Sequence, residues 1–192
     1  SSDFLLIQTK FQQLPIPLCC VKFVNLQINL MEMTPTDHKH PDSDRHEAAK
    51  QAVIDRRYLR MAEIWAENSY CQRRKVGAII VKNSMIISDG FNGTPSGFEN
   101  VCEDEAGITK PYVLHAEATA ITKVARSNNS SDGATLYITA SPCMECSKLI
   151  IQAGIKRVVY HELYRITDGI ELLRRAGVEC VHVPELAPDA TT

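Results

Sequence analysis

The sequence lacks any long hydrophobic run, and it lacks a strong excess of charge of either sign. Every apolar stretch is shorter than the about 18 residues that a membrane-spanning helix requires, so we expect no membrane span in these residues. Lysine and arginine total 21 against 23 aspartate and glutamate, which gives a formal net charge of −2. That balance disfavours the broad basic surface of a nucleic-acid-binding protein. With 44% hydrophobic residues, the composition is typical of a soluble globular protein.

The N-terminal residues lack the features of a secretion signal. Residues 1–32 have no basic start and no small-residue cleavage site, and prolines and lysines interrupt their apolar stretch. The seven cysteines are an odd number, which disfavours a disulfide framework and favours a reducing, cytoplasmic location. Met31 and Met33 are candidate translation starts, so we interpret residues 1–44 as an N-terminal extension and linker that is disordered or artefactual. Residues 186–192 are expected to form a polar tail.

Two short motifs carry the strongest functional signal. The motif H-x-E places His115 two residues before Glu117, and the motif P-C-x-x-C, which contains Cys143 and Cys146, follows it. One imidazole and two thiolates form an accepted ligand set for a catalytic zinc ion that keeps an open position for water. This pair of motifs is the signature of zinc-dependent nucleobase deaminases, in which the glutamate is the general acid and base. The alternatives are a structural zinc module and, for the cysteines alone, a disulfide or redox pair.

The expected local structure is a second, independent reason to predict a metal site. A β-rich run, residues 134–140, precedes the cysteine motif, and a helix is predicted directly after that motif. A second predicted helix, residues 116–124, follows His115. Free backbone N–H groups at a helix N-terminus favour thiolate over thiol, so Cys143 and Cys146 suit a metal ion. Two helix N-termini would therefore face one metal.

The remaining elements alternate between helices and strands. We predict a helix at residues 57–68, two strands at 76–81 and 85–88 around a hairpin-like turn, a strand at 157–160, a helix at 168–176 and a strand at 178–183. The resulting order, α-β-β-α-β-α-β-α-β, favours one layered α/β domain with a central mixed sheet. We place this domain at residues 45–185.

Four further segments accompany the zinc motifs. They are residues 69–78 (SYCQRRKVGA), 90–97 (GFNGTPSG), 100–103 (NVCE) and 154–160 (GIKRVVY). With these segments, the chain resembles deoxycytidylate (dCMP) deaminases of the zinc-dependent cytidine deaminase superfamily, from about Asp55 to Val183. The resemblance implies a three-layer α/β/α fold with a central mixed five-stranded sheet, one catalytic Zn²⁺ ion and a homo-oligomer, from dimer to hexamer. It also implies hydrolysis of dCMP to dUMP and ammonia, which supplies thymidylate synthesis.

The chemistry assigns a role to each residue of the two motifs. His115, Cys143 and Cys146 would bind zinc, and Glu117 would take a proton from the water that attacks C4 of the pyrimidine. Glu117 would then protonate N3 and the departing amine, so that one carboxylate serves as base and acid in turn. Ala116, between the histidine and the glutamate, is a further expected substrate contact.

Other substrate contacts are expected in loops around this centre. The resemblance places a ribose contact at Asn92, although an asparagine before glycine is equally a common turn residue. Tyr164 is a candidate to stack on the base or to border the sugar, and the alternative is a half-buried tyrosine. The 5′-phosphate needs cationic donors. The candidates are Arg73, Arg74 and Arg165, each of which is alternatively an ordinary surface charge.

A glycine-rich segment has a candidate regulatory role. In regulated dCMP deaminases a similar loop binds an allosteric nucleotide, dCTP as activator or dTTP as inhibitor. The matching residues here are Gly90, Asn92, Gly93, Thr94 and Gly97. Backbone N–H groups in such a loop can cradle phosphate, and Mg²⁺ would accompany the nucleotide. The alternative is a flexible loop without a ligand.

Two departures from the family pattern bear on selectivity and on metal content. Thr119 stands where the family usually has asparagine, and nucleoside-type cytidine deaminases tolerate threonine at that place. Cys71 and Cys102 match the cysteines of a second, structural zinc in some relatives. Residues 110–114 contain no histidine to complete that site, so we expect two buried thiols instead.

Four other functions compete with this interpretation of the sequence. A nucleic-acid deaminase of the tRNA-editing kind shares both motifs but would be expected to show a basic face. A free (deoxy)cytidine deaminase would be indifferent to the 5′-phosphate. A non-catalytic, zinc-stabilised binding domain would need no glutamate beside the histidine. A riboflavin-pathway deaminase fits worst, because that family spaces its two cysteines further apart.

Overall fold

The computed structural model describes residues 41–164 and 166–186. By its internal contacts the chain divides into two compact units, Ser1–Ser43 and Asp44–Thr192, and the second contains all the motifs described above. The interpretation of residues 1–40 as an extension and of residues 187–192 as a tail lies outside the described residues.

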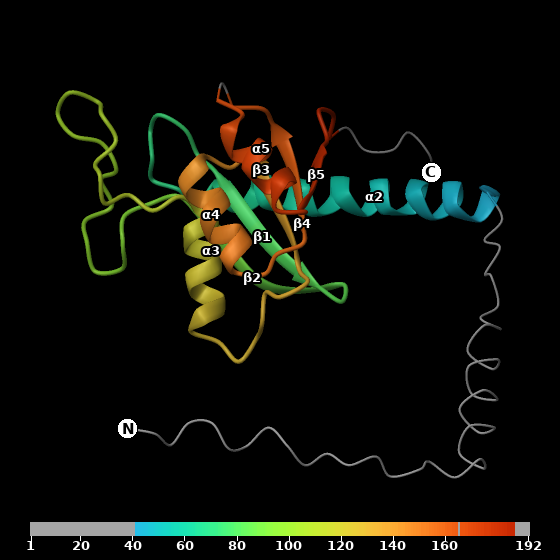
Figure 1. The fold of residues 1–192 in the computed structure, drawn as a ribbon. Coiled ribbons are helices and arrows are strands. Elements are labelled where there is room, and N and C mark those ends of the chain that lie inside the picture. The colour runs from blue at the N-terminus through green and yellow to red at the C-terminus, as the bar shows by residue number, and fades with distance from the viewer. Residues whose placement is uncertain (1–40, 165, 187–192) are drawn as a thin grey trace, which may run out of the picture. The chain divides into compact units, whose positions relative to one another are not determined.

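Helices and strands alternate in the predicted order (Figure 1). In chain order they are α2 (Pro41–Ala66), β1 (Gly77–Lys82), β2 (Met85–Phe91), α3 (Ala116–Ala125), β3 (Thr135–Ala140), α4 (Met144–Gln152), β4 (Arg157–Glu162), α5 (Asp168–Arg175) and β5 (Glu179–His182). The predicted order of elements is therefore confirmed. None of the helices in these described ranges is long and apolar enough to cross a membrane.

Helix α2 is longer than the sequence predicts, because it begins at Pro41 rather than at residue 57. Residues 43–50 are all exposed, so this part of the helix has no buried face and no hydrophobic periodicity to reveal it. Its alanine, glutamate and lysine residues favour a helix by intrinsic propensity alone. Residues 41–44, which we interpreted as linker, belong to this helix.

The five strands form one mixed sheet in the order β2-β1-β3-β4-β5. Strand β1 pairs antiparallel with β2 and with β3, whereas β3, β4 and β5 are parallel to one another. Strands β1 and β3 are buried along nearly their whole lengths, as expected for strands that are covered on both faces. The predicted mixed five-stranded sheet is confirmed.

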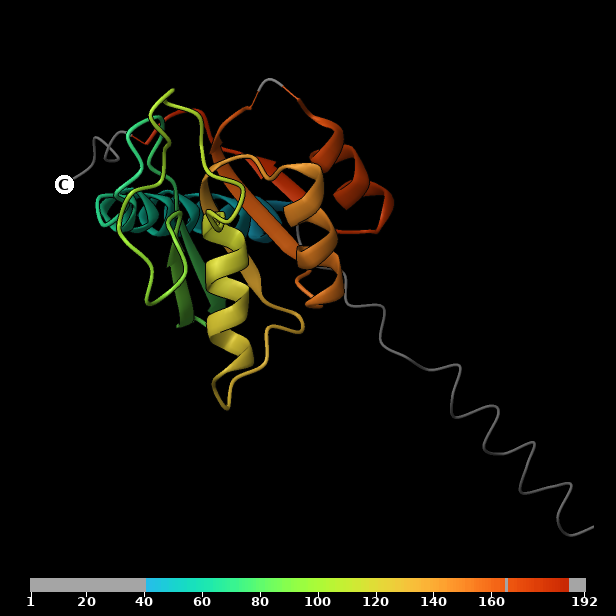
Figure 2. The same cartoon turned by 90° about the vertical axis from the view of Figure 1, so that its left-hand side faces the viewer.

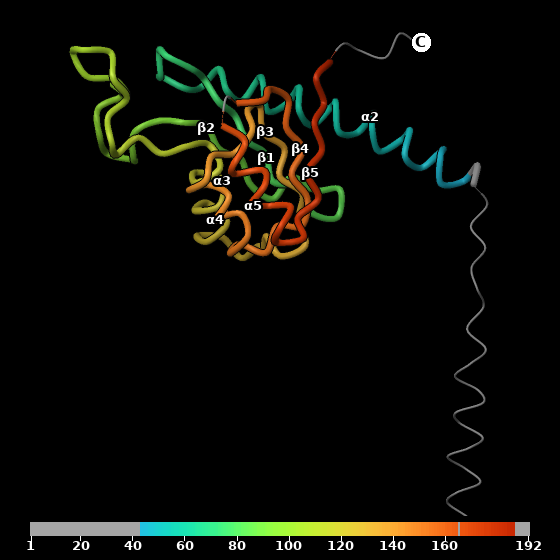
Figure 3. The backbone as a smooth tube through the Cα atoms, turned by 45° about the horizontal axis from the view of Figure 1, so that its top comes forward, coloured from blue at the N-terminus to red at the C-terminus, as the bar shows by residue number. Residues whose placement is uncertain are grey.

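Helices cover both faces of this sheet and complete the three-layer α/β/α fold. Helix α2 lies on one face, and α3, α4 and α5 lie on the other (Figure 3). Figure 2 shows α3 and α4 side by side on their face of the sheet. The core between the sheet and these three helices includes Ala120, Ile150 and Leu173, and the core beneath α2 includes Leu59 and Ala62.

Two glycines let the helices approach the sheet closely. A Cβ atom on Gly90 of β2 would lie 2.3 Å from the carbonyl oxygen of Ala116 in α3. A Cβ atom on Gly77 of β1 would lie 2.0 Å from the carbonyl oxygen of Ala62 in α2. Any larger side chain at either position would push a helix away from the sheet. Gly90 therefore allows the first turn of α3 to pack closely on β2.

A buried ion pair joins α2 to the sheet. Asp55 is 2% exposed, and Arg157 donates two hydrogen bonds of 2.8 Å to its carboxylate. The hydroxyl of Tyr137 and the amide of Gln51 donate to the same carboxylate at 3.0 and 2.8 Å. Burial opposes the ionisation of Asp55, but these donors outweigh it and hold its pKa below the ordinary value of 3.8. The pair stays charged at neutral pH and fixes α2 on the sheet.

Candidate metal and catalytic site

The three predicted zinc ligands come from the N-terminal ends of two neighbouring helices. His115 is the N-cap of α3, Cys143 is the N-cap of α4, and Cys146 lies in the first turn of α4. The two N-cap residues have almost the same extended backbone, with φ of −75° and ψ of 158° and 171°. Neither side chain caps its own helix, and the imidazole and the thiol contact each other instead.

The distances between the ligand atoms fit a zinc ion. The Sγ atoms of Cys143 and Cys146 lie 3.5 and 3.4 Å from Nδ1 of His115. Zinc in tetrahedral geometry, with Zn–N of about 2.0 Å and Zn–S of about 2.3 Å, places nitrogen and sulfur ligands about 3.5 Å apart. Within residues 41–164 and 166–186, this is the only cluster of three potential ligand groups. The structure therefore brings the three predicted ligands together at nitrogen–sulfur distances that suit a zinc ion.

The electrostatics of the cluster also suit a cation. Hydrogen bonds with Cys146 and His115 lower the pKa of Cys143 to about 3. The hydrogen bond with Cys143, together with burial, raises the pKa of Cys146. The pKa of His115 is raised in turn, chiefly by its hydrogen bond with Cys143. A zinc ion would displace these protons, because coordinated thiols are deprotonated.

Glu117 lies in the first turn of α3 and is 4% exposed. Burial raises its pKa to about 7, even though His115 nearby has the opposite effect. A carboxyl group with that pKa can accept and donate protons near neutral pH, which general acid–base catalysis requires. Its burial beside the ligand cluster suits the predicted role of Glu117.

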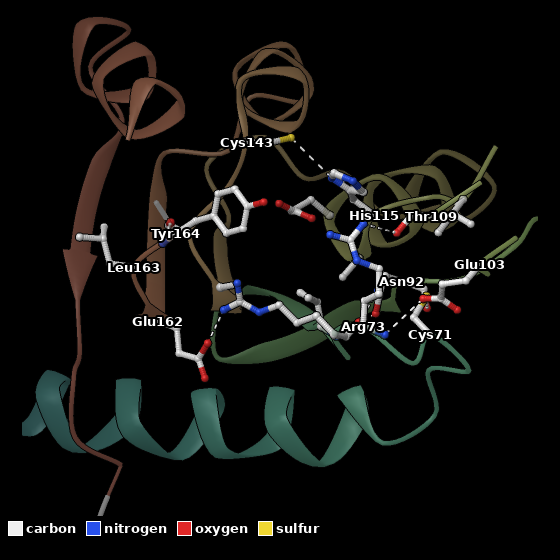
Figure 4. A pocket seen from close by; sticks show the side chains of 17 residues that line it. Cys71, Arg73, Asn92, Glu103, Thr109, His115, Cys143, Glu162, Leu163 and Tyr164 are labelled. Carbon is white, nitrogen blue, oxygen red and sulfur yellow. Dashed lines mark hydrogen bonds and ion pairs between the residues drawn. The ribbon is translucent and has the colours of Figure 1, made fainter. Parts of the chain in front are cut away.

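One cavity of about 620 Å³ is lined by His115, Glu117 and Cys143, whereas the buried Cys146 does not line it. Figure 4 shows His115, Cys143 and Tyr164 side chains around it, contributed by different segments of the chain. The predicted site residues that line the cavity are Arg73, Arg74, Asn92, His115, Ala116, Glu117, Cys143 and Tyr164. Its volume lies within the range of small-molecule sites, about 300–1,000 Å³. The fold thus brings predicted metal, catalytic and substrate residues to one place.

Two predicted arginines form part of the cavity rim. Arg74 pairs with the carboxylate of Glu162 and lies over the ring of Tyr164, with its guanidinium carbon 5.7 Å from the ring centroid. Arg73 donates a hydrogen bond of 3.2 Å to the hydroxyl of Thr109. The third candidate, Arg165, lies outside the described residues. A rim that holds two guanidinium groups can attract an anion.

Asn92 connects the rim to the sheet. Its Oδ1 atom accepts a hydrogen bond of 2.7 Å from the backbone N–H of Val76, and its Nδ2 atom donates one of 2.9 Å to the carbonyl of Arg74. The amide also lines the cavity. The residue predicted to contact a sugar or to serve in a turn therefore also positions the loop that carries Arg74.

The glycine-rich segment is only partly a loop. Gly90 is buried in β2 against α3, and Gly93 bonds to the carbonyl of Leu114 at 3.1 Å. The hydroxyl of Thr94 donates to the carbonyl of Glu99 at 2.9 Å, and Gly97 has a positive φ of 93°. The cavity wall includes none of Gly90, Gly93, Thr94 and Gly97.

The structure also places the residues that depart from the family pattern. The Thr119 hydroxyl donates a hydrogen bond of 3.2 Å to the carbonyl of His115 within α3, and Thr119 does not line the cavity. Cys71 and Cys102 are both buried, as predicted. Burial, followed by the hydrogen bond with Cys71, raises the pKa of Cys102 to about 12, which keeps this thiol protonated.

Several further wall residues were not predicted from the sequence as part of the site, among them Ser141, Glu103 and Glu162. Ser141 accepts a hydrogen bond of 2.8 Å from the backbone N–H of Tyr164. Glu103 accepts hydrogen bonds from the backbone N–H groups of residues 72 and 73, at 3.1 and 3.3 Å. Ser141 directly precedes the cysteine motif, which is a usable signal. Nothing local marks Glu162, because its partner Arg74 lies 88 residues away in the sequence.

Comparison with known proteins agrees with this geometry. The family described as "Cytidine and deoxycytidylate deaminase zinc-binding region" matches residues 53–162, which include all three ligands and Glu117. The chain belongs to this family. A deoxycytidylate deaminase of Enterobacteria phage T4 is 35% identical to this deaminase over 170 residues, covering 66% of this chain and 88% of the phage protein. A deoxycytidylate deaminase of Mycobacterium phage D29 is 38% identical over 120 residues, covering 55% of this chain and 92% of the phage protein.

Solved structures show the same fold. The dCMP deaminase from cyanophage S-TIM5, in complex with dCMP and dUMP, superposes on this deaminase with a TM-score of 0.66 and 48% identity. That comparison covers 76% of this chain and all of the cyanophage chain. A diaminohydroxyphosphoribosylaminopyrimidine deaminase/5-amino-6-(5-phosphoribosylamino)uracil reductase from Thermotoga maritima gives a TM-score of 0.56 at 26% identity, covering 69% of this chain and 37% of the Thermotoga chain. The fold is thus shared with solved deaminases.

Proposed function

We propose that this deaminase hydrolyses dCMP to dUMP and ammonia in the cytoplasm, and that dUMP supplies thymidylate synthesis. The observation that carries the proposal is one cavity with three parts. It is lined by His115 and Cys143 of a His-Cys-Cys cluster with zinc-binding geometry, by a buried glutamate with a pKa of about 7, and by two arginines. The cyanophage relative, 48% identical, is a dCMP deaminase that binds dCMP and dUMP. The catalytic domain is proposed to extend over residues 45–185.

The reaction uses the residues of the cluster in two distinct ways. His115, Cys143 and Cys146 would hold a zinc ion, which when bound lowers the pKa of water and so supplies a nucleophile at neutral pH. Glu117 accepts a proton from the attacking water as oxygen adds to C4 of the pyrimidine, and it delivers that proton to N3. Glu117 next moves the remaining hydroxyl proton to the amine, and the C4–N bond breaks to release ammonia. Each water consumed yields one dUMP and one ammonia.

The rim residues are proposed to recognise the rest of the nucleotide. Arg73 and Arg74 would bind the 5′-phosphate through charge-assisted hydrogen bonds, with Arg165 as a third candidate donor. Asn92 would bind the sugar, and its two backbone hydrogen bonds hold it in a fixed orientation. Tyr164 would border the base or the sugar, because its ring lines the cavity beside Arg74. The backbone of Ala116 would contact the base beside Glu117.

A second candidate function is the deamination of free deoxycytidine. The ion pair between Arg74 and Glu162 favours this second function, because it already neutralises part of the positive charge at the rim. A phosphate would have to displace that carboxylate, whereas a nucleoside would not.

Regulation by nucleotides is proposed for the segment from Gly90 to Gly97. The backbone N–H groups of Asn92 and Gly93 already donate to Val76 and Leu114, so the later residues of the segment, up to Gly97, would bind the triphosphate of dCTP as activator or dTTP as inhibitor, together with Mg²⁺. Support comes from the position of the segment, since Asn92 connects it to the loop of Arg74. The active form is proposed to be a homo-oligomer.

The initial rate of ammonia release from dCMP and from deoxycytidine, measured in parallel with zinc-loaded protein, tests the function. A strong preference for dCMP, together with a KM for dCMP that rises in Arg73→Gln and Arg74→Gln while the KM for deoxycytidine does not, would support the proposal. Equal turnover of both substrates would contradict phosphate recognition and favour a nucleoside deaminase. No ammonia from either substrate would contradict both functions. Addition of dCTP to the same assay tests activation.

A further inference from the structure

Glu162 places a negative charge beside a proposed phosphate donor. The described wall of the cavity has three carboxyl groups, those of Glu103, Glu117 and Glu162. Glu117 is buried beside the metal ligands, and Glu103 accepts hydrogen bonds from two backbone N–H groups. Glu162 ends β4, and its carboxylate pairs with the guanidinium of Arg74 (Figure 4). The wall therefore contains an anion at the place where we propose that a phosphate binds.

The contact between Arg74 and Glu162 is open to solvent. The side chain of Glu162 is 60% exposed, and that of Arg74 is 35% exposed. In the pair that joins α2 to the sheet, by contrast, Asp55 is buried and receives two hydrogen bonds from Arg157. Exposed ion pairs contribute little free energy, because water solvates both partners when they separate. The carboxylate of Glu162 can therefore leave Arg74 at small cost, whereas Asp55 cannot leave Arg157 in this way.

Other contacts hold Arg74 in place without this carboxylate. Its guanidinium carbon lies 5.7 Å from the centroid of the Tyr164 ring, and its backbone carbonyl accepts a hydrogen bond of 2.9 Å from Asn92. Tyr164 is held in turn, since its backbone N–H donates to the hydroxyl of Ser141 at 2.8 Å. A guanidinium group has five N–H donors in a fixed arrangement that suits phosphate as well as carboxylate. Arg74 is thus placed to give up one anion for another.

We propose that Glu162 is a specificity-determining residue, which occupies Arg74 in the free chain and is exchanged for the 5′-phosphate of the substrate. This inference rests on the proposed function, because it takes the phosphate of the nucleotide to bind at the rim. A phosphate monoester carries a charge of about −1.5 to −2 at pH 7. It therefore outcompetes a carboxylate, whereas a singly charged anion only replaces like with like. Glu162 lowers the affinity of the rim for every anion and so favours the more highly charged one.

Binding of dUMP, the proposed product, tests the exchange without turnover. The dissociation constants of dUMP and of deoxyuridine are measured by isothermal titration calorimetry with the full, zinc-loaded chain. Glu162→Gln keeps an oxygen that can accept from Arg74 but removes the charge. In this variant the ratio of the deoxyuridine constant to the dUMP constant should rise about two- to fivefold, the range that an exposed ion pair allows. In an Arg74→Gln background the same change should have little effect, because the exchanged cation is gone.

Glu179→Gln is the matched control for the loss of a negative charge. The side chain of Glu179 is 62% exposed and accepts a hydrogen bond of 3.1 Å from Arg157, but it lies in β5 and outside the cavity wall. Its ratio of dissociation constants should be that of wild type. A ratio that fell or stayed the same in Glu162→Gln would overturn the proposal. An equal rise in Glu179→Gln, or a full effect of Glu162→Gln in the absence of Arg74, would also overturn it.

Failure of the proposed function has a different signature. A wild type that bound dUMP no more tightly than deoxyuridine would contradict phosphate recognition, and the exchange with it. A chain that released no ammonia from dCMP but showed the expected rise in the ratio would contradict the proposed reaction and support the exchange. Circular dichroism and zinc content establish that each variant is folded and loaded with metal.

Discussion

Replacing Gly90 with alanine tests whether the contact between β2 and α3 positions the catalytic groups. The added Cβ atom would lie 2.3 Å from the carbonyl oxygen of Ala116 and 2.6 Å from the backbone nitrogen of Ala120. An ordinary contact needs about 3.4 Å, so the start of α3 must move by about 1 Å relative to the strand. Ala116 lies between His115 and Glu117, and both would move with it.

The expected effect on catalysis is larger than the effect on folding. A displacement of about 1 Å between reacting groups costs on the order of a hundredfold in rate. Overpacking by one methyl group costs about 1–3 kcal/mol in the free energy of unfolding, which a domain of this size tolerates in many cases. Gly90→Ala should therefore remain folded and lose about two decades in kcat.

Gly77→Ala is the matched control, because its Cβ atom would clash at 2.0 Å with the carbonyl of Ala62 in α2, on the other face of the sheet. Both variants should lose stability in urea unfolding, but only Gly90→Ala should lose kcat in the ammonia assay. If Gly90→Ala kept the wild-type kcat, the inference that Gly90 sets the position of α3 would be refuted. If it lost only its response to dCTP, the regulatory role of this glycine would be favoured instead.

Three further outcomes are expected. Glu117→Gln should keep its zinc, measured by atomic absorption, and should lose about two to four decades of turnover, because the amide cannot carry protons. Near-normal turnover would contradict the assignment of Glu117 as the general acid and base. Removal of zinc by a chelator should abolish ammonia release, zinc alone should restore it, and full activity after metal removal would contradict metal-assisted chemistry. Asp55→Asn should lower the free energy of unfolding by about 3–5 kcal/mol at pH 7, since it leaves Arg157 without its buried partner. Because the pKa of Asp55 is lowered in the folded chain, its stabilisation is complete above the ordinary value of 3.8 and is lost as the pH falls below it. The variant should therefore show a weaker acid dependence in urea unfolding, and an unchanged dependence would argue against the ion pair.

The metal centre could be predicted from the sequence because its information is local. His115 and Glu117 are two residues apart, and Cys143 and Cys146 are one helical turn apart, so each motif fixes its own geometry at a helix start. The alternation of helices and strands was predictable for the same reason, since each buried strand and each amphipathic helix has a periodicity of its own.

The cavity wall could not be predicted in the same way. The partner of Arg74 is Glu162, and the residue that orients the loop of Arg74 is Asn92, so the relevant contacts join distant segments. Gly90 belongs to a glycine-rich run and was expected in a loop, but packing against α3 places it in β2. The start of α2 was missed because it is helical without a buried face.

The separation between helix ends and rim loops has a consequence for how this enzyme can change. The metal ligands and Glu117 are fixed by two helices packed on the sheet, whereas Arg73, Arg74 and Tyr164 are held by a few side-chain and backbone hydrogen bonds between loops. A substitution in those loops can alter which molecule is accepted without disturbing the reactive centre. Reactivity and selectivity are therefore carried by separable parts of the chain, and new substrate ranges are best sought by varying the rim alone.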